Sequence, residues 1–386
     1  MRKCHGGVAL VLATCLSPLH FLFNVIPARG DARREGEIMY PRFKPLAALL
    51  SLLPIYSVSA ETLQLAALDP ILVTATRQAM RSSELLSDVT VVDHEELEQA
   101  GQSQLGDVLA RQPGIEFYSQ GSNGATGSVF MRGTNSGHTL VLIDGMRVSS
   151  ATLGQMSSWS RIPASQIERI EILRGPASSL YGSDAIGGVI QIFTRQGNGP
   201  FHANGEIGAG SYDTYSATGG FSGSQDAWRY ALNANTYRTN GFNSIKNPKN
   251  GAYNSDSDGF YNNSISGNLA YTFAKGHEAG ASVFYSEGEN KYDSGFTKAT
   301  AAKDYRNQLA VSSFNTFLKN AFTENWTSTL RFGHGTDDSN NLTNRNSSSL
   351  FRTDQEQYAW QNDIKTGIGS FLLGVERLDQ RVSGTG

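Results

Sequence analysis

The sequence predicts an all-β transmembrane β-barrel that follows a smaller α+β domain, and three observations support this fold class. Beyond Pro200, apolar and polar residues alternate over successive strands of about ten residues, which is typical of a sheet with one apolar face. Short turns alternate with long polar loops, an asymmetry that outer-membrane barrels share. The 41 Gly, 15 Tyr and 19 Phe residues favour many strands with tight turns and aromatic belts over a helical bundle.

The alternation assigns side chains to two faces of the predicted strands. A soluble sandwich would bury the apolar face, whereas a membrane barrel turns it to lipid and keeps a polar lumen. The loop asymmetry favours the barrel, with tight turns at 274–276 and 323–325 and long loops near 239–260, 287–304 and 336–353. The apolar positions are Trp228, Tyr230, Leu232, Ala234, Ile265, Leu269, Tyr271, Phe273, Ala279, Ala281, Val283 and Tyr285.

Length and charge set broad limits on the protein. A chain of 386 residues predicts two domains. Its 32 basic and 35 acidic residues nearly balance, so nothing indicates a nucleic acid as a partner. The two cysteines, Cys4 and Cys15, lie at the extreme N-terminus, so we expect no disulfide in the processed protein.

Two export signals compete at the N-terminus. Residues 8–26 are largely apolar, but Pro18 and His20 interrupt them. A second signal, residues 39–60, has a basic start, an apolar stretch and a small-residue cleavage site at Val58-Ser59-Ala60. We therefore expect residues 1–38 to be an upstream extension and residues 39–60 to be the signal peptide of an exported protein.

The part between the signal and the barrel has compact α+β patterning. Helical spacing in QLGDVLARQPG ends at a Pro-Gly stop, and four apolar runs between residues 129 and 195 are expected as strands. The polar, glycine-rich loops 118–128 and 149–160 are of a kind that often carries function. Ahead of them, LDPILVTATR at residues 68–77 reads either as an ordinary first strand or as a template for β-augmentation by another chain.

No motif for catalysis emerges from the sequence. GSDAIGG lacks the Lys-Ser/Thr ending of a P-loop, and no GxGxxG opens a helix after a strand. His94-Glu95-Glu96 begins like a zinc-protease motif, but Glu98 stands where a second histidine is required. We therefore expect that the protein is not an enzyme.

The stretch AYNSDSDGFYNNS, residues 252–264, raises the question of calcium. Asn254, Asp256 and Asp258 alternate before a glycine, as ligands do in an EF-hand loop. The twelfth position is Ile265, so the closing carboxylate is absent and the EF-hand interpretation fails. From these residues alone, a hydrophilic turn and a different kind of calcium loop both remain open.

Three segments resemble a known family. LDPILVTATR resembles a TonB box, and VFMRGTNSGHTLVLIDGMRV and IERIEILRGPASSLYGSDAIGGVIQIFTR resemble plug signatures. From about Leu68 onward, the sequence resembles TonB-dependent outer-membrane transporters, and within them the cobalamin transporters of Gram-negative bacteria. The resemblance implies a TonB box segment at 61–78, a plug domain at 79–199 and an incomplete N-terminal part of the β-barrel at 200–386, with about nine of the family's 22 strands.

The resemblance also implies a structural Ca²⁺ site in two extracellular loops. Asn243 stands where the family has Asp, and Asn254 where it has Gln, so both keep an oxygen ligand. Carboxylates on neighbouring loops would repel one another without a cation, and calcium accepts six to eight oxygen ligands. The implied metal ligands are Asn243, Asn254, Asp256, Asp258, Tyr292, Asp293 and Asp304.

Binding positions follow from the same resemblance. The TonB-binding segment falls on Asp69, Pro70, Ile71, Leu72, Val73, Thr74, Ala75 and Thr76. The substrate contacts fall on Thr126, Ser128, Asn135, Leu153, Gly154 and Ser294, of which Ser128 and Asn135 keep the family's residue type.

The expected function is active import of cobalamin or a related corrinoid across the outer membrane. The expected partners are TonB with ExbB and ExbD, the corrinoid and outer-membrane lipid, and a monomer is expected. A siderophore or haem receptor is the closest alternative, although the barrel half has only His202, His277 and His334 to serve haem. A calcium-dependent adhesin or a passive porin would need neither plug nor TonB box.

Overall fold

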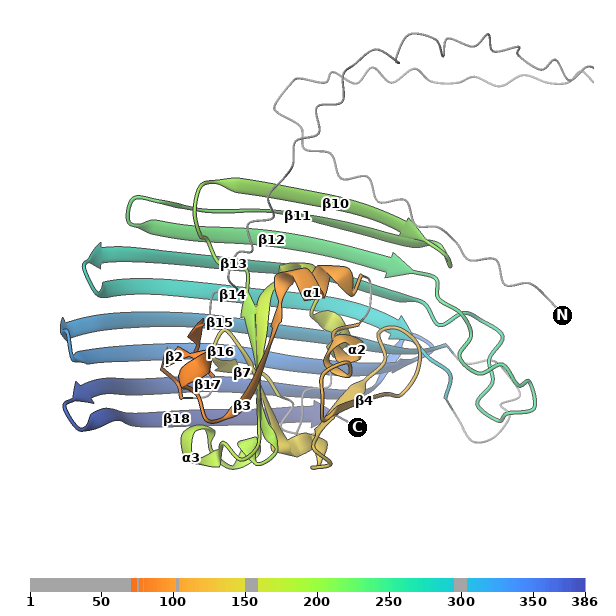
Figure 1. Ribbon diagram of the computed structural model, residues 1–386. Helices are drawn as coiled ribbons and strands as arrows, with labels where there is room; N and C mark the ends of the chain where they lie inside the picture. The colour runs from red at the N-terminus through yellow and green to blue at the C-terminus, as the bar shows by residue number, and fades with distance from the viewer. Residues whose placement is uncertain are drawn as a thin grey trace, which may run out of the picture. The chain divides into compact units, whose positions relative to one another are not determined.

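The computed structural model describes residues 71–74, 76–78, 80–101, 104–149, 159–294 and 304–385. The predicted signal peptide and upstream extension lie outside these residues. So do five of the predicted site residues, which are Asp69, Pro70, Ala75, Leu153 and Gly154. Within the described residues, a small α+β domain lies against one face of a large antiparallel sheet (Figure 1).

The α+β domain is built on a five-stranded sheet in the order β3-β8-β9-β6-β7. Strands β6 and β9 are parallel, and the other neighbours are antiparallel. A separate hairpin, β4-β5, and the short pair β1-β2 accompany it. The strands are β1 Ile71–Leu72, β2 Met80–Arg81, β3 Asp88–Asp93, β4 Ile115–Ser119, β5 Gly127–Met131, β6 Thr139–Ile143, β7 Met146–Arg147, β8 Ile167–Arg174 and β9 Gly188–Thr194.

Short helices connect these strands. The α-helices are α1 His94–Gln99, α2 Leu105–Leu109 and α3 Ser178–Tyr181. The 3₁₀ turns are η1 Ser82–Glu84, η2 Ser136–His138, η3 Trp159–Arg161, η4 Ala164–Gln166 and η5 Ser183–Ala185. Helix α2 lies in the stretch where helical spacing was predicted, and it approaches β4 closely at Gly106. A Cβ there would stand 2.4 Å from the Phe117 ring, so only glycine permits this contact.

The core of the domain covers both faces of the central sheet. Every residue of β6 and β9 is buried, as expected for strands with neighbours on both sides. One cluster includes Ile143, Ile170 and Ile192, and a smaller cluster on other residues includes Leu142 and Val189. Phe284 and Val311 of the large sheet belong to the first cluster, so the two parts share a hydrophobic core.

The large sheet confirms the predicted partial barrel. Its nine strands pair antiparallel in sequence order, from β10 to β18. The tight turns 226–227, 275–276, 324–325 and 367–368 lie at one end of the sheet, and the longer connections 240–259 and 292–304 lie at the other (Figure 1). The strands are β10 His202–Gly210, β11 Thr214–Gln225, β12 Trp228–Thr239, β13 Phe260–Ala274, β14 His277–Lys291, β15 Tyr305–Thr323, β16 Trp326–Thr343, β17 Asn346–Thr366 and β18 Gly369–Thr385.

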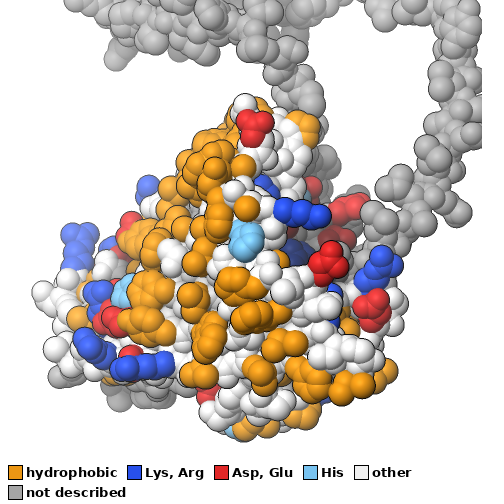
Figure 2. Space-filling view, turned by 90° about the vertical axis from the view of Figure 1, so that its left-hand side faces the viewer, with side chains coloured by type: hydrophobic (Ala, Val, Ile, Leu, Met, Phe, Trp, Pro, Cys, Tyr) orange, Lys and Arg blue, Asp and Glu red, His pale blue; other side chains and the backbone are white. Residues whose placement is uncertain are grey.

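The predicted faces of the sheet are confirmed. Large apolar side chains such as Leu232, Ile265 and Val283 are exposed on the outward face, and their neighbours along the strands turn towards the α+β domain. Figure 2 shows hydrophobic side chains spread across the side of the molecule turned to the viewer. An exposed apolar sheet face of this kind suits a lipid environment.

One predicted loop is wrong. Residues 336–353 do not form a long loop, because β16 and β17 continue through them and leave only Asn344 and Arg345 as the turn. Both turn residues have positive φ, 51° and 68°, as a two-residue type I′ hairpin requires. Their polar neighbours bond across the strands, as in the 3.0 Å bond from Asn341 to Ser349, so a polar sequence extends the hairpin.

Among the described residues, no helix is long and apolar enough to cross a membrane.

Candidate functional site

The predicted TonB-binding segment is held by one buried carboxylate. Glu171 of β8 is fully buried, and its Oε2 accepts hydrogen bonds from the backbone N–H groups of Val73 and Thr74, both at 2.9 Å. The Thr74 hydroxyl donates to the same oxygen at 2.8 Å. The Tyr181 hydroxyl donates to the Thr74 carbonyl at 2.9 Å. Leu72 and Thr74 are thereby buried against the sheet.

Sequence reasoning did not identify Glu171, although a signal was present. The Glu171 carboxylate lies within IEIL, residues 170–173 of β8, where all four residues are buried and an unpaired charge would be costly. Besides the segment, it has one cation, Arg169, at 2.9 Å. The backbone N–H groups of Val73 and Thr74 therefore satisfy the Glu171 oxygen that Arg169 does not contact.

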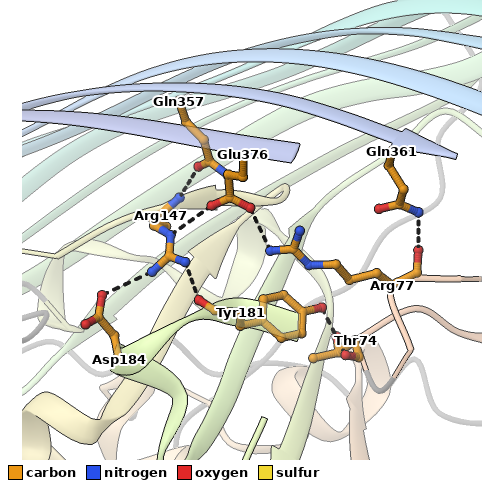
Figure 3. Close-up of polar contacts among 8 residues, drawn as sticks. All are labelled: Thr74, Arg77, Arg147, Tyr181, Asp184, Gln357, Gln361 and Glu376. Atoms are coloured by element: carbon orange, nitrogen blue, oxygen red, sulfur yellow. Dashed lines mark hydrogen bonds and ion pairs between the residues drawn. The ribbon is translucent and has the colours of Figure 1, made fainter. Parts of the chain in front are cut away.

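The residues after the segment are tied to the large sheet. Arg77 forms a 2.8 Å ion pair with Glu376 of β18, and its carbonyl accepts a hydrogen bond from Gln361 of β17 at 2.9 Å (Figure 3). Gln78 donates to Asp363 at 2.9 Å. The Arg77 guanidinium also lies 4.4 Å above the Tyr181 ring, a cation–π contact. The segment is thus held at Val73 and Thr74 and again by the residues that directly follow it.

Glu376 also contacts a second arginine. Its other oxygen lies 3.4 Å from Nε of Arg147 in β7, and Arg147 pairs with Asp184 at 3.1 Å and donates to the Tyr181 carbonyl (Figure 3). The Arg147 backbone N–H donates to Gln357 at 3.3 Å. One carboxylate of the large sheet therefore bridges β7 and the residue that follows the predicted TonB-binding segment.

The two predicted calcium loops bring three carboxylates into electrostatic contact. Both oxygens of Asp293 are buried, and neither has a hydrogen bond of ordinary geometry. Burial and the neighbouring charges of Asp258 and Asp256 raise the pKa of Asp293 to about 6, which the Asn254 backbone N–H offsets in part. Asp258 is 1% exposed and accepts from the Ser244 N–H at 2.8 Å. This arrangement disfavours the ionised, metal-free state.

The other predicted calcium ligands contact different partners, and not all of them are free to bind a metal ion. The Asn243 side chain donates to the Asn254 carbonyl, and Tyr292 lies with its ring 5.8 Å from that of Tyr305. Asp304 instead pairs with Arg306 at 2.8 Å, which holds its pKa below the usual range. Across residues 71–294 and 304–385, as far as they are described, no group of three His, Cys, Asp or Glu side chains is already arranged to hold a metal ion.

The described substrate-contact positions lie on separate elements. Thr126 is half-buried just before β5, and Ser128 is buried within it. Asn135 is exposed and caps η2, accepting from the Gly137 N–H at 3.4 Å. Ser294 is exposed beside Asp293. The structure does not gather these four side chains into one pocket.

The family of the α+β domain follows from comparison with known proteins. Residues 81–189 match the model of the TonB-dependent receptor plug domain. Residues 81–189 therefore form a TonB-dependent receptor plug domain, and the antiparallel sheet that follows them resembles part of the barrel of such receptors.

A particular relative is the vitamin B12 transporter BtuB of Photobacterium profundum. The two sequences are 32% identical over 323 residues, which cover 82% of this chain and 51% of the relative. The chain thus spans about half the length of the curated relative that it matches.

Solved structures agree on the fold. The siderophore receptor PirA of Acinetobacter baumannii aligns with a TM-score of 0.61 at 22% identity, covering 81% of this chain and 50% of that one. The ferric enterobactin receptor PfeA of Pseudomonas aeruginosa aligns with a TM-score of 0.58 at 18% identity, covering 77% and 50%. At these identities the likeness concerns the fold alone.

Proposed function

We propose that this chain is part of an outer-membrane receptor that imports cobalamin or a related corrinoid with energy delivered by TonB, assisted by ExbB and ExbD. The observation that carries TonB dependence is the docking of Val73 and Thr74 on Glu171 through their backbone N–H groups. A strand held in this way can be exchanged for pairing with another chain, which is how β-augmentation recognises a partner.

The polar contacts give the segment a stability that a partner must overcome. Hydrogen bonds to a charged group contribute about 1.5–3 kcal/mol each, so the Glu171 contacts keep the segment docked at rest. Glu376 adds an ion pair to Arg77 and touches Arg147 of the plug. A rearrangement of the plug at Arg147 would weaken the hold on Arg77 and favour release towards the periplasm.

Calcium is part of the proposal for the two acidic loops. Three carboxylates and unpaired oxygens on Asp293 suit a hard cation with oxygen ligands. Asp256, Asp258 and Asp293 would hold the ion, with Asn243, Asn254 and Tyr292 supplying further oxygens. When bound, calcium would neutralise the carboxylates and tie the loops together. Asp304 would join only by leaving Arg306.

The corrinoid assignment rests on the similarity to BtuB, a vitamin B12 transporter by name. A siderophore receptor is the second candidate, because PirA and PfeA are siderophore receptors by name. At 32% identity, the corrinoid relative is the nearer of these by sequence.

Binding to receptor purified from outer membranes tests this proposal. Cyanocobalamin should bind, and ferric enterobactin, other ferric siderophores and haem should compete weakly or not at all. Tight binding of a siderophore or of haem, with no binding of cyanocobalamin, would overturn the corrinoid assignment and leave TonB dependence to be judged separately by uptake with and without TonB.

A further inference from the structure

We propose that Arg161 is the positioning residue through which order in the two acidic loops reaches the plug, a role that rests on the proposed calcium function. Arg161 belongs to η3 of the plug and is fully buried. Its guanidinium reaches into the large sheet, where Nη1 donates to the Tyr261 carbonyl at 3.1 Å and Nη2 to Asn290 Oδ1 at 3.4 Å.

The two partners stand at the bases of the two loops. Tyr261 follows Asp258 by three residues at the start of β13, and Asn290 precedes Asp293 by three residues at the end of β14. These strands are neighbours, and Asn290 pairs with Phe260 in the last rung before the loops diverge. A single plug side chain thus connects the residues from which both loops emerge.

The residues around Arg161 leave space for its guanidinium and hold it in place. A Cβ on Gly288 would stand 2.3 Å from Nη1 and 2.1 Å from the Tyr261 carbonyl, so glycine leaves the room that the guanidinium needs. The Ser286 hydroxyl donates to the Arg161 carbonyl at 2.5 Å. The Phe260 ring lies 4.8 Å from the guanidinium and closes the other side.

A buried arginine that only anchored the plug would be expected to have a carboxylate partner, and Arg161 differs in this respect. Among the described residues, no carboxylate lies within ion-pair distance of it, and its buried Nε has no acceptor. Burial lowers the pKa of Arg161 to about 9. A planar guanidinium presents its donors in a rigid fork that suits two acceptors on two strands at once, whereas a lysine ammonium is a compact charge on a flexible chain.

If Arg161 has this role, ordering of the two acidic loops and ordering of the plug are linked through its contacts with Tyr261 and Asn290. If calcium fixes the loops, it also steadies the last rungs of β13 and β14, which carry Tyr261 and Asn290, and Arg161 passes that constraint to η3. Replacing Arg161 should leave the loop carboxylates in place but disconnect them from the plug. Linked sites usually differ about 5- to 150-fold in affinity with and without the second ligand.

The experiment compares Arg161→Met, Arg161→Lys and Asn290→Ala with the unchanged receptor. Hydrogen exchange is followed with and without calcium, at residues 243–258 and 290–294 for the loops and at 159–166 for the plug. Cyanocobalamin affinity is measured under both conditions. Arg195→Met is the matched control, since Arg195 is a half-buried plug arginine and the acidic neighbours of its guanidinium, Glu98 and Glu168, belong to the plug.

In the unchanged receptor and in Arg195→Met, calcium should slow exchange in loops and plug and tighten cyanocobalamin binding. In Arg161→Met, calcium should still protect the loops, but the plug response should vanish and the gain in affinity fall to about twofold or less. In Arg161→Lys and Asn290→Ala, the plug response and the gain in affinity should lie between those of Arg161→Met and the unchanged receptor. These two variants serve as the test if Arg161→Met does not fold. If calcium still slows exchange in the plug of the Arg161 and Asn290 variants as much as in the unchanged receptor, the role of Arg161 is overturned while the calcium function stands. No calcium response in the unchanged receptor would remove the calcium function and this role together.

Discussion

Arg77 and Glu376 form a 2.8 Å ion pair that joins the residue after the predicted TonB-binding segment to β18, the last described strand of the sheet. Both side chains are about four-fifths buried. Because the same carboxylate also contacts Arg147, the pair belongs to a small network in which plug, segment and sheet meet at one residue.

Glu376→Gln should loosen this segment. Loss of the charge removes two charge-assisted contacts and should make local opening easier by about 1 kcal/mol, or roughly fivefold in the open population. Hydrogen exchange at residues 71–78 measures the change. Asp379→Asn is the control, because Asp379 pairs with Arg377 on the outward face of the same strand. Equal acceleration in both variants would show that the network does not hold the segment.

Glu171→Gln should make the segment available to TonB. The neutral amide keeps the shape of the side chain but weakens the bonds from Val73 and Thr74, by about 1–3 kcal/mol in total. A purified periplasmic TonB domain should therefore bind at least about fivefold tighter. Glu116→Gln, an exposed change in β4, should leave this affinity as it is. An unchanged affinity in Glu171→Gln would mean that this docking does not limit TonB binding.

Val73→Pro should abolish uptake and preserve substrate binding at the outer surface. Proline removes the N–H that Val73 donates to Glu171 and that a pairing strand would use. Val73→Ala keeps the backbone donor and should transport normally. Uptake of labelled cyanocobalamin by cells compares the two variants. Normal transport by Val73→Pro would place the coupling strand elsewhere.

Calcium binding should weaken as the pH falls through about 6. The pKa of Asp293 is raised from 3.8 to about 6, so the folded loop takes up a proton between these values that the unfolded chain does not. The contribution of this carboxyl to metal-free stability is therefore full below pH 3.8 and lost as the pH rises through 6. Calcium titrations at pH 5, 6 and 7 should show the competition with that proton.

Two variants show which carboxyl group causes the pH dependence of calcium binding. Asp293→Asn should remove most of the pH dependence together with most of the affinity. Asp304→Asn should leave the transition near pH 6 in place, because Arg306 lowers the pKa of Asp304 and its titration lies at more acid pH. Calcium affinity that is flat from pH 7 to pH 5 in the unchanged receptor would show that Asp293 is not a ligand.

Periodic features of the fold were predictable from the sequence. Alternation placed Leu232, Ile265 and Val283 on one face, and the lengths of the connections placed the two acidic loops at one end of the sheet. The hairpin at 344–345 was missed because its polar residues resemble a loop, whereas cross-strand bonds extend the strands.

The contacts that hold the segment could not be predicted in this way. Glu171 lies about a hundred residues from Thr74 in sequence, and Glu376 lies about three hundred from Arg77. No local pattern encodes such pairs, and only the presence of a glutamate inside an apolar strand gave a hint. The TonB-binding, substrate and calcium residues remain predictions.

Titration with cyanocobalamin in calcium and in chelator tests whether a corrinoid binds over the plug at loops that calcium orders. The unchanged receptor should bind about 5- to 150-fold tighter with calcium, and the double variant Asp256→Asn with Asp293→Asn should lose most of that difference while still folding into the membrane. Equal affinities with calcium and with chelator in the unchanged receptor would show that calcium does not order the substrate site and would leave residues 252–264 as a solvated turn.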